Sequence, residues 1–547
     1  MRDQKMNNPP EGDTSAPRRK RRSAKGIPSS PAGKVSVSHV CVAKPQHFAK
    51  FMSLKGILLP VLTALLLLLG FPPFDLFLAP WFALVPFFLA VRHGAHWKNA
   101  LKGLLSGTLF FALLIWWLNY VTTIGYVLLV LYLSLYFAFA SWFLGLFRSN
   151  ALRALVLSPL WVSLEFFRSS GIFGFSWGLL GHTQYRSLPT IQIASSTGVY
   201  GISALLAATS AALGYWFLQR CEKRCRFRAL HAVIVVVVLV HLFGLWALSQ
   251  HPEGTPLKVG LLQGNVPQLL KWEPDMEDPT IKLYTQMTHD ALARGAELVV
   301  WPETAVPDVL DWKPDWENQF KQFCAKERFN LLFGALHHDV DAGRYFNSAY
   351  YMTPESASAE HGVQRYDKMR LVPFGEYVPF RNLLPFVQEV VESEGGGLFS
   401  GGVDLTVFQA GRAAFSTLIC FESTLPSVAR VLVQNGARAL VVLTNDEWFG
   451  RTPASLQHGL QSVFRAVENR VPVVRATNTG WTCSIDTRGR ILATVPRFEE
   501  GILVDNMPVP DRVGTVYTRW GDWFAWLCVV VVTTMAALTL KKQRVKR

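Results

Sequence analysis

The stretch AAFSTLICFES, residues 413–423, predicts the fold of the larger part of this chain. A short, largely apolar run of this kind is typical of a buried strand. It is followed at once by Cys420, Phe421 and Glu422, where we expect the chain to turn. Reactive side chains gather just beyond the carboxyl ends of strands in α/β sheets. The stretch therefore predicts a strand of an α/β domain, followed by residues that could carry chemistry.

The alternation of strands and helices extends on both sides of this stretch. LKVGLLQ and AELVVW predict strands, and TIKLYTQMTHDALARG predicts an amphipathic helix that ends at a glycine. About 260 residues share the pattern, which is within the usual range of one domain. We therefore expect an α/β domain over residues 251–515. Further helices are expected near 316–328, 425–436 and 454–470, and further strands near 330–336, 346–352, 437–443, 472–476, 481–486 and 490–495.

The rest of the chain is strongly hydrophobic. Of the 547 residues, 50% are hydrophobic and only 17% are charged, whereas soluble proteins carry about 25% charged residues. A helix that spans a membrane needs about 20 mostly apolar residues. Eight runs meet this requirement, and the fifth is the weakest because it contains Glu165. The runs are roughly 54–71, 75–92, 101–119, 124–146, 151–167, 196–217, 229–248 and 521–540.

The distribution of charge predicts how the chain is oriented. The net charge of +15 comes from the ends of the chain and from short loops, whereas residues 256–512 have an excess of Asp and Glu. Cytoplasmic loops collect Lys and Arg, so we expect both termini in the cytoplasm and the α/β domain on the outer, periplasmic side. The basic loops that alternate with uncharged ones are 92–99, 147–153 and 219–228.

Four regions follow from these patterns. Residues 1–52 are expected to form a basic, disordered cytoplasmic tail, and residues 53–250 a region of seven transmembrane helices. The α/β domain occupies 251–515, and 516–547 contain the eighth helix with a basic cytoplasmic tail. Nucleic acid is not an expected partner, because the positive charge does not gather on a folded face with interleaved aromatic residues.

Three ionisable residues of the α/β domain are candidates for catalysis. Glu303 follows the strand AELVVW, Lys368 lies in a charged loop, and Cys420 follows the strand AAFSTLI. Each alone has an ordinary structural explanation, such as a helix cap, a solvated lysine or a buried thiol. Together they supply a nucleophile, a base and a cation for a developing negative charge. The seven cysteines have no spacing typical of a metal site, and the three in this domain leave at least one thiol free.

The segments around these residues resemble a known family. WPET, YDKMRLVPFGEYVP and LICFES, in this order, resemble the Glu-Lys-Cys triad of the nitrilase superfamily. With the eight apolar runs, the chain resembles the apolipoprotein N-acyltransferase family of bacterial cytoplasmic, or inner, membranes. Further motifs that carry the resemblance are QGNVPQLLKW, TNDEWFG, RAVENRVPVVRATNTG and TVYTRWGDW.

The resemblance implies a fold and a reaction. The fold is a multi-pass helical membrane domain with an extracytoplasmic nitrilase-like αββα sandwich. Cys420 would attack the sn-1 ester of a phospholipid, expected to be phosphatidylethanolamine, and form a thioester. The free α-amino group of a diacylglyceryl-cysteine, at the N-terminus of an apolipoprotein, would then take the acyl chain. Neither a metal nor a cofactor is expected.

The resemblance also implies a role for each site residue. Glu303 would be the general base, while Lys368 and the backbone N–H of Phe421 would stabilise the oxyanion. Glu376 and Glu422 would support the site, and Trp272 would lie in a loop near the substrate.

Two other functions remain open from the residues themselves. The first is a membrane-tethered amidase of nitrilase type, in which water resolves the thioester; the triad alone does not distinguish it. The second is a membrane binding protein or transporter with an inactive domain. The joint presence of Glu303, Lys368 and Cys420 disfavours the second.

Overall fold

The computed structural model describes residues 46–219, 223–250, 254–358, 362–379 and 399–544. Residues 1–45, most of the predicted N-terminal tail, therefore lie outside the described residues. So do the last three residues of the chain and residues 220–222 of the predicted basic loop at 219–228.

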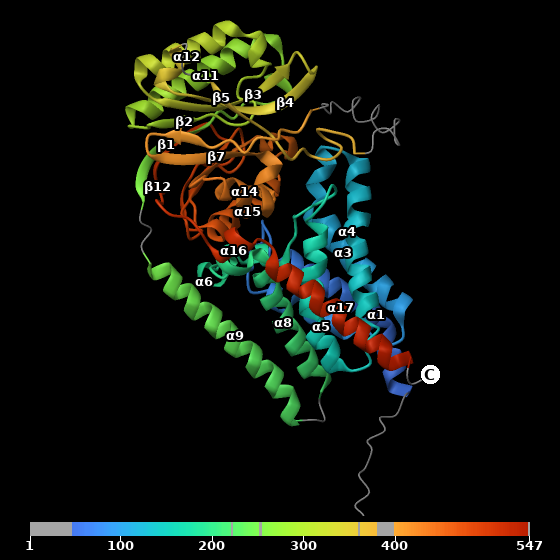
Figure 1. Cartoon of the computed structure of the whole chain (residues 1–547). Coiled ribbons are helices and arrows are strands. Elements are labelled where there is room, and N and C mark those ends of the chain that lie inside the picture. Colours follow the sequence, from blue (N-terminus) through green and yellow to red (C-terminus); the bar gives the residue numbers. More distant parts are fainter. Residues whose placement is uncertain (1–45, 220–222, 251–253, 359–361, 380–398, 545–547) are drawn as a thin grey trace, which may run out of the picture. The chain divides into compact units, whose positions relative to one another are not determined.

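Each of the eight apolar runs overlaps a helix of more than ten residues in the structure (Figure 1). Among the described residues, four are long and apolar enough to cross a membrane by themselves: α4, α8, residues 227–249 of α9, and α17. The apolar parts of α1 and α2 are shorter. The structure thus supports a membrane region, while eight crossings stay a prediction. The helices are α1 (Gln46–Leu68), α2 (Pro80–Ala90), α3 (His96–Leu114), α4 (Thr123–Leu144), α5 (Asn150–Arg168), α8 (Val199–Leu218), α9 (Lys223–Ser249) and α17 (Trp523–Arg544).

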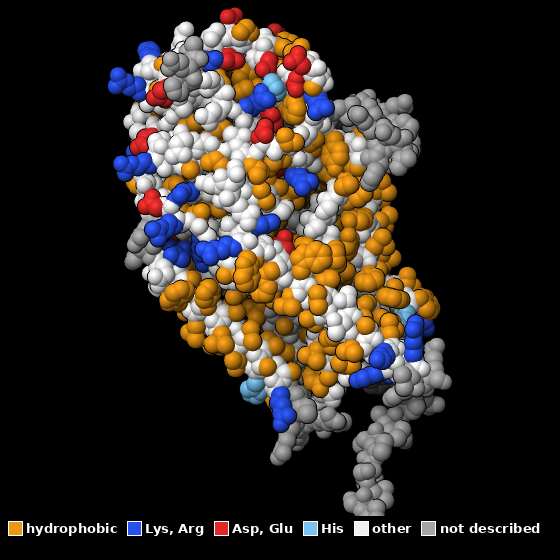
Figure 2. All heavy atoms as spheres, in the orientation of Figure 1, with side chains coloured by type: hydrophobic (Ala, Val, Ile, Leu, Met, Phe, Trp, Pro, Cys, Tyr) orange, Lys and Arg blue, Asp and Glu red, His pale blue; other side chains and the backbone are white. Residues whose placement is uncertain are grey.

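The surface of these helices is apolar. Leu239, Leu242 and Trp246 of α9 are more than half exposed, as is Val530 of α17. Figure 2 shows hydrophobic side chains gathered over the helices, whereas acidic side chains gather over the strand-containing part of this face. Soluble proteins rarely expose a contiguous apolar patch of such extent, and a lipid environment accounts for it.

The residues between α5 and α8 pack against the α/β domain. The Ser176 hydroxyl donates to the carbonyl oxygen of Thr424 at 2.8 Å, and the Gln192 amide donates to that of Arg488 at 2.9 Å. This segment therefore contacts the residues that follow Cys420. The segment contains η2 (Leu180–Gln184), α6 (Leu188–Ile191) and α7 (Ala194–Thr197). Elsewhere in the membrane region, the short helix η1 (Trp116–Tyr120) precedes α4.

Two six-stranded mixed sheets form the α/β domain. In each sheet three neighbouring strands are parallel: β1, β2 and β3 in the first, and β7, β8 and β9 in the second. The first sheet has the order β12 (Gly501–Val509), β1 (Thr255–Gln263), β2 (Leu298–Val300), β3 (Asn330–Asp339), β4 (Arg344–Met352), β5 (Gln364–Asp367). The second has the order β11 (Ile491–Thr494), β10 (Cys483–Ile485), β9 (Val473–Thr477), β8 (Ala439–Thr444), β7 (Ala413–Ile419), β6 (Phe408–Ala410).

Helices cover the outer face of each sheet (Figure 1). In the first layer Trp301, just after β2, packs on Tyr284 of α11 and Phe320 of α12, with ring centroids 5.3 and 5.4 Å apart. The inner faces of the sheets meet each other, so the predicted αββα sandwich is confirmed. The remaining helices are α10 (Gln268–Lys271), α11 (Pro274–Ala293), η3 (Leu310–Trp312), α12 (Pro314–Glu327), η4 (Pro354–Ala357), η5 (Cys420–Thr424), α14 (Pro426–Gln434), η6 (Asp446–Phe449), α15 (Ala454–Asn469) and α16 (Val516–Trp520).

Helix α15 joins the sandwich to the membrane region. Nearly all of its residues are buried, because one side packs on the second sheet and the other meets residues that precede the α/β domain. Its Gln457 accepts a hydrogen bond from the Trp117 indole at 3.0 Å, and its Glu468 accepts one from the Val199 amide at 3.1 Å. These contacts fix the second sheet, and with it the Cys420 segment, against the membrane helices.

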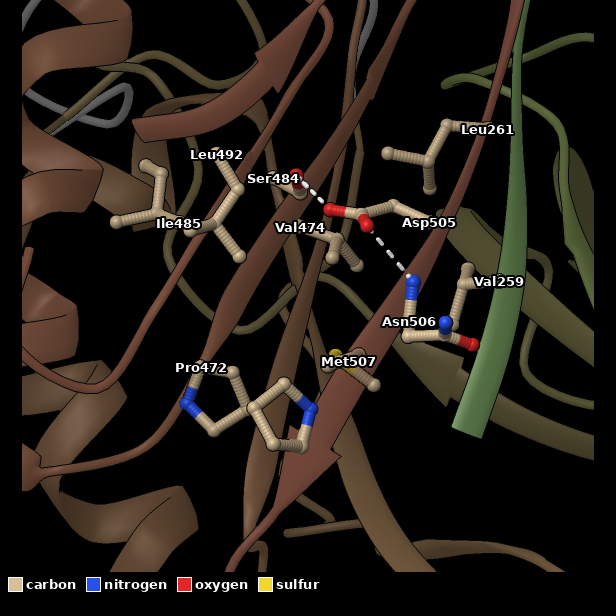
Figure 3. Close-up of a pocket in the computed structure, with 11 residues that line it drawn as sticks. Val259, Leu261, Pro472, Val474, Ser484, Ile485, Leu492, Asp505, Asn506 and Met507 are labelled. Atoms are coloured by element: carbon tan, nitrogen blue, oxygen red, sulfur yellow. Dashed lines mark hydrogen bonds between the residues drawn. The ribbon is translucent and has the colours of Figure 1, made fainter. Parts of the chain in front are cut away.

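A pocket lies between the two sheets, away from the candidate catalytic residues. The Ser484 hydroxyl donates to the Asp505 carboxylate across it, and none of the candidate site residues lines it (Figure 3). The pocket therefore belongs to the packing of the sandwich.

Candidate active site

The carboxyl ends of parallel strands in the two sheets bring the candidate residues together. Glu303 follows β2, Cys420 follows β7, and Asn445 follows β8. Two backbone positions here have the left-handed conformation that non-glycine residues rarely adopt: Thr304 with φ 47° and Cys420 with φ 51°. Such conformations are frequent at functional sites because the surrounding structure must hold them.

The Glu303 carboxylate accepts hydrogen bonds on both oxygens. Oε1 accepts from the Asn347 side-chain amide at 2.8 Å, and Oε2 accepts from the backbone N–H of Asn445 at 2.9 Å. The ammonium of Lys368 lies 3.6 Å from Oε1. Because donors converge on both oxygens, the carboxylate is held in one orientation.

Lys368 is buried between two carboxylates. Its Nζ lies 2.7 Å from Oε1 of Glu376 and 3.6 Å from Oε1 of Glu303. Burial alone would lower the pKa of Lys368, but the negative charges of Glu376 and Glu303 outweigh it and the pKa is raised. Glu376 is itself fixed by the backbone N–H of Val372 at 2.8 Å. Lys368 is therefore a permanently charged, oriented cation.

The thiol of Cys420 is half-buried beside these charges. Burial raises its pKa, the Glu303 charge raises it further, and the Lys368 charge opposes both. The net effect keeps the thiol protonated at neutral pH. A thiol acts as a nucleophile only as its thiolate, so an attack by Cys420 would need a base to remove the proton.

Glu422 connects, through hydrogen bonds, the segment that carries Cys420 and the segment that carries Lys368. Its buried carboxylate accepts from the backbone N–H groups of Ile419, Met369 and Arg370, at 2.9, 2.8 and 3.0 Å, and from the Tyr366 hydroxyl. Burial raises the pKa of Glu422 to about 7, against these hydrogen bonds and the Lys368 charge. Its contacts therefore set the position of Lys368 relative to Cys420.

The other two expected residues lie at the edge of this group. Phe421 follows Cys420 in η5, with its side chain partly buried. The Trp272 ring is 44% exposed at the end of α10, where the Lys271 ammonium lies 5.9 Å from its centroid. The Trp272 side chain is therefore accessible from outside the site.

Three further residues of the site were missed by the sequence analysis. Asn347 and Asn445 orient Glu303, and Lys271 donates from its buried Nζ to the Glu303 carbonyl oxygen at 3.1 Å and to Thr304 Oγ1 at 2.7 Å. Burial lowers the pKa of Lys271 to about 7. A polar side chain within the apolar strand FNSAYYM could have indicated Asn347. Asn445 lies in the motif TNDEWFG and Lys271 in the motif QGNVPQLLKW, both of which are noted above.

The other cysteines of the α/β domain are free. Cys324 and Cys483 are both buried and unpaired, and burial raises the pKa of each to about 12. They are therefore inert beside Cys420. Within the described residues, no group of three or more His, Cys, Asp or Glu side chains could hold a metal ion.

Two family models match the chain over the two regions of the fold. The model described as the apolipoprotein N-acyltransferase N-terminal domain matches residues 63–212. The model described as carbon-nitrogen hydrolase matches residues 258–513.

Curated proteins are similar to the chain over most of its length. The apolipoprotein N-acyltransferase of Geobacter metallireducens is 36% identical over 506 residues, which cover 89% of this chain and 96% of the relative. That of Methylococcus capsulatus is 33% identical over 501 residues, which cover 88% and 95%. Among solved structures, an amidase from Nesterenkonia sp. is 18% identical with a TM-score of 0.36, covering 48% of this chain and 94% of the amidase.

Proposed function

The chain belongs to the apolipoprotein N-acyltransferase family and is an acyltransferase, and we propose that Cys420, Glu303 and Lys368 carry out its reaction. The observation that supports this assignment is the ion pair of Glu303 and Lys368, 3.6 Å apart, whose two charges both act on the Cys420 thiol. A thiol, a base and a cation thus lie close together at the carboxyl ends of strands from both sheets.

The first half-reaction forms a thioester. Glu303 takes the proton of Cys420 as Sγ attacks the ester carbonyl carbon of a phospholipid. The negative charge that develops on the carbonyl oxygen is stabilised by Lys368 and by the backbone N–H of Phe421. The carbon–oxygen bond of the ester breaks, and the glycerol oxygen takes the proton from Glu303. A lysophospholipid leaves, and Cys420 carries the acyl chain.

The second half-reaction forms an amide. The α-amino group of a diacylglyceryl-cysteine attacks the thioester carbonyl, and Glu303 accepts a proton from the amine. The carbon–sulfur bond breaks, and the proton returns to Cys420. The same base serves both steps because each step moves one proton between a nucleophile and a leaving group.

The substrates of the family are a lipid acyl donor and a lipoprotein acceptor. We propose phosphatidylethanolamine, cleaved at the sn-1 position, as the donor. The exposed apolar helices support a lipid donor, because a site next to the bilayer avoids moving an acyl chain into water at about 0.8 kcal/mol per CH₂. The amidase alternative is not favoured, since relatives over most of the chain are acyltransferases.

The chain is a membrane protein, and we propose a bacterial inner membrane with the sandwich on the periplasmic side. Support comes from the basic loops and tails around the apolar runs. A reporter fused after about residue 250 is expected to report the periplasm, and one fused after residue 547 the cytoplasm. A cytoplasmic signal at 250 would overturn the count of seven preceding spans.

Positional labelling of the phospholipid tests the proposed chemistry. The purified protein is given phosphatidylethanolamine labelled in either the sn-1 or the sn-2 chain, with a diacylated lipopeptide as acceptor. Label from sn-1 alone is expected in the lipopeptide, and Cys420→Ala abolishes the transfer. Cys324→Ala is the matched control, because it removes another buried thiol of the same domain. Transfer that survives in Cys420→Ala would place the nucleophile elsewhere.

A further inference from the structure

A second group of polar side chains lies buried directly behind the nucleophile. His458 of α15 places Nδ1 2.7 Å from Asp446 Oδ1, and its Nε2 lies 3.0 Å from the Ser423 hydroxyl and 3.1 Å from the carbonyl oxygen of Cys420. All three side chains are inaccessible to solvent. They therefore cannot touch a substrate, yet they contact the backbone of the residue that does.

Hydrogen bonds connect the imidazole to the backbone of the nucleophile. The Ser423 hydroxyl donates to the Cys420 carbonyl oxygen at 2.8 Å, and His458 Nε2 lies within hydrogen-bonding distance of both groups. Because a carbonyl oxygen can only accept, a hydrogen bond between it and His458 uses an N–H on Nε2. Nδ1 faces the Asp446 carboxylate, which holds the ring in place.

The surroundings of Asp446 stabilise its charged form. Burial would raise the pKa of Asp446, but His458 and Arg475 outweigh it and the pKa is lowered. The guanidinium of Arg475 lies 3.8 Å from Oδ2, and Gly480 leaves room for the carboxylate where a Cβ would strike it. The Trp177 ring, with its centroid 5.5 Å from that of the imidazole, packs beside it.

The carbonyl oxygen that receives these hydrogen bonds belongs to the peptide unit between Cys420 and Phe421. That unit also carries the Phe421 N–H, the proposed donor to the oxyanion. Hydrogen bonds in series strengthen one another in a buried site. Donors on the carbonyl side therefore make the N–H on the other side a stronger donor and fix the plane of the peptide.

We propose that His458, held by Asp446, is a positioning residue that orients and polarises the Cys420–Phe421 peptide for oxyanion stabilisation. The inference rests on the proposed function, because it requires acyl transfer through Cys420. It adds a residue of α15 to the three residues that surround the substrate carbonyl.

Two reactions of the same thiol test this proposal. Acylation by phosphatidylethanolamine passes through an oxyanion, whereas alkylation by iodoacetamide displaces iodide and does not. Both rates are measured on the full-length protein and on its His458→Gln variant, which lacks the imidazole. We expect the kcat of acylation to fall at least about tenfold. Removal of a donor that contacts the oxyanion itself lowers kcat more, by roughly 10²–10³-fold. The KM for phospholipid and the alkylation rate stay within about twofold.

The outcomes separate this proposal from the proposed function. If acylation and alkylation fall together, or neither changes, His458 has no specific effect on the oxyanion and the proposal is wrong. Should His458→Gln fail to fold, Asp446→Asn is measured in the same way, because it removes the charge and keeps the shape. If the unsubstituted protein forms no acyl adduct on Cys420, the proposed function itself fails.

Discussion

Replacing Glu303 by Gln removes the proposed base while keeping its size. Three donors converge on the carboxylate, from Asn347, Asn445 and Lys368. An amide offers one acceptor oxygen in place of two, so one buried donor is left without an acceptor at a cost of about 1–3 kcal/mol. Loss of general-base catalysis lowers acylation by about 10²–10⁴-fold.

The same substitution affects the reactivity of the thiol in the opposite direction. The Glu303 charge raises the pKa of Cys420, so removal of this charge lowers that pKa. When the pKa of a thiol falls by one, the thiolate fraction at neutral pH increases by about tenfold. Alkylation of Glu303→Gln by iodoacetamide at neutral pH is therefore expected to match or exceed that of the unsubstituted protein. Both rates are followed by intact-mass spectrometry, with thermal unfolding as the control for folding. Parallel loss of acylation and alkylation would refute the role of Glu303 as a base.

The remaining predictions concern charge and protonation at the same site. Lys368→Met is expected to slow both acylation and alkylation, because the cation lowers the pKa of Cys420; unchanged alkylation would contradict this. The alkylation rate of Cys420 should rise by about tenfold per pH unit from about pH 6 to about pH 9 without levelling off, since its pKa is raised. The pKa of Glu422 in the folded state is raised to about 7. Between about pH 4.5 and about pH 7 the folded state therefore binds a proton that the unfolded state has released. The stability that this proton binding provides is lost as pH rises from about 4.5 through about 7. In Glu422→Gln that part of the pH dependence of the thermal midpoint disappears; an identical pH dependence in both proteins would mean that Glu422 does not titrate in this window.

The fold was largely predictable because its strongest elements are continuous apolar runs. The parallel strands β7 and β8 lie inside the core, and their sequences read as strands without tertiary information. The strands β5, β6 and β12 were not predicted. β5 and β6 are short, and β12 carries Pro508, which is tolerated because this edge strand pairs only with β1.

The candidate site was predictable only where a residue follows a recognisable strand or motif. Glu303 and Cys420 follow apolar strands, so their place at the sheet ends could be inferred. His458 could not, because a histidine within an amphipathic helix resembles any other buried polar residue. Its contact with the Cys420 carbonyl depends on how α15 packs beneath η5, which is a tertiary property.

Intact-mass spectrometry of the protein incubated with phosphatidylethanolamine tests whether Cys420 carries the acyl chain. We expect a gain of one fatty-acyl mass on Cys420, which persists in water and is lost when a diacylated lipopeptide with a free N-terminal amine is added and becomes triacylated. An adduct that decays as fast without the lipopeptide, or a protein that gains no acyl mass on Cys420, would contradict this expectation.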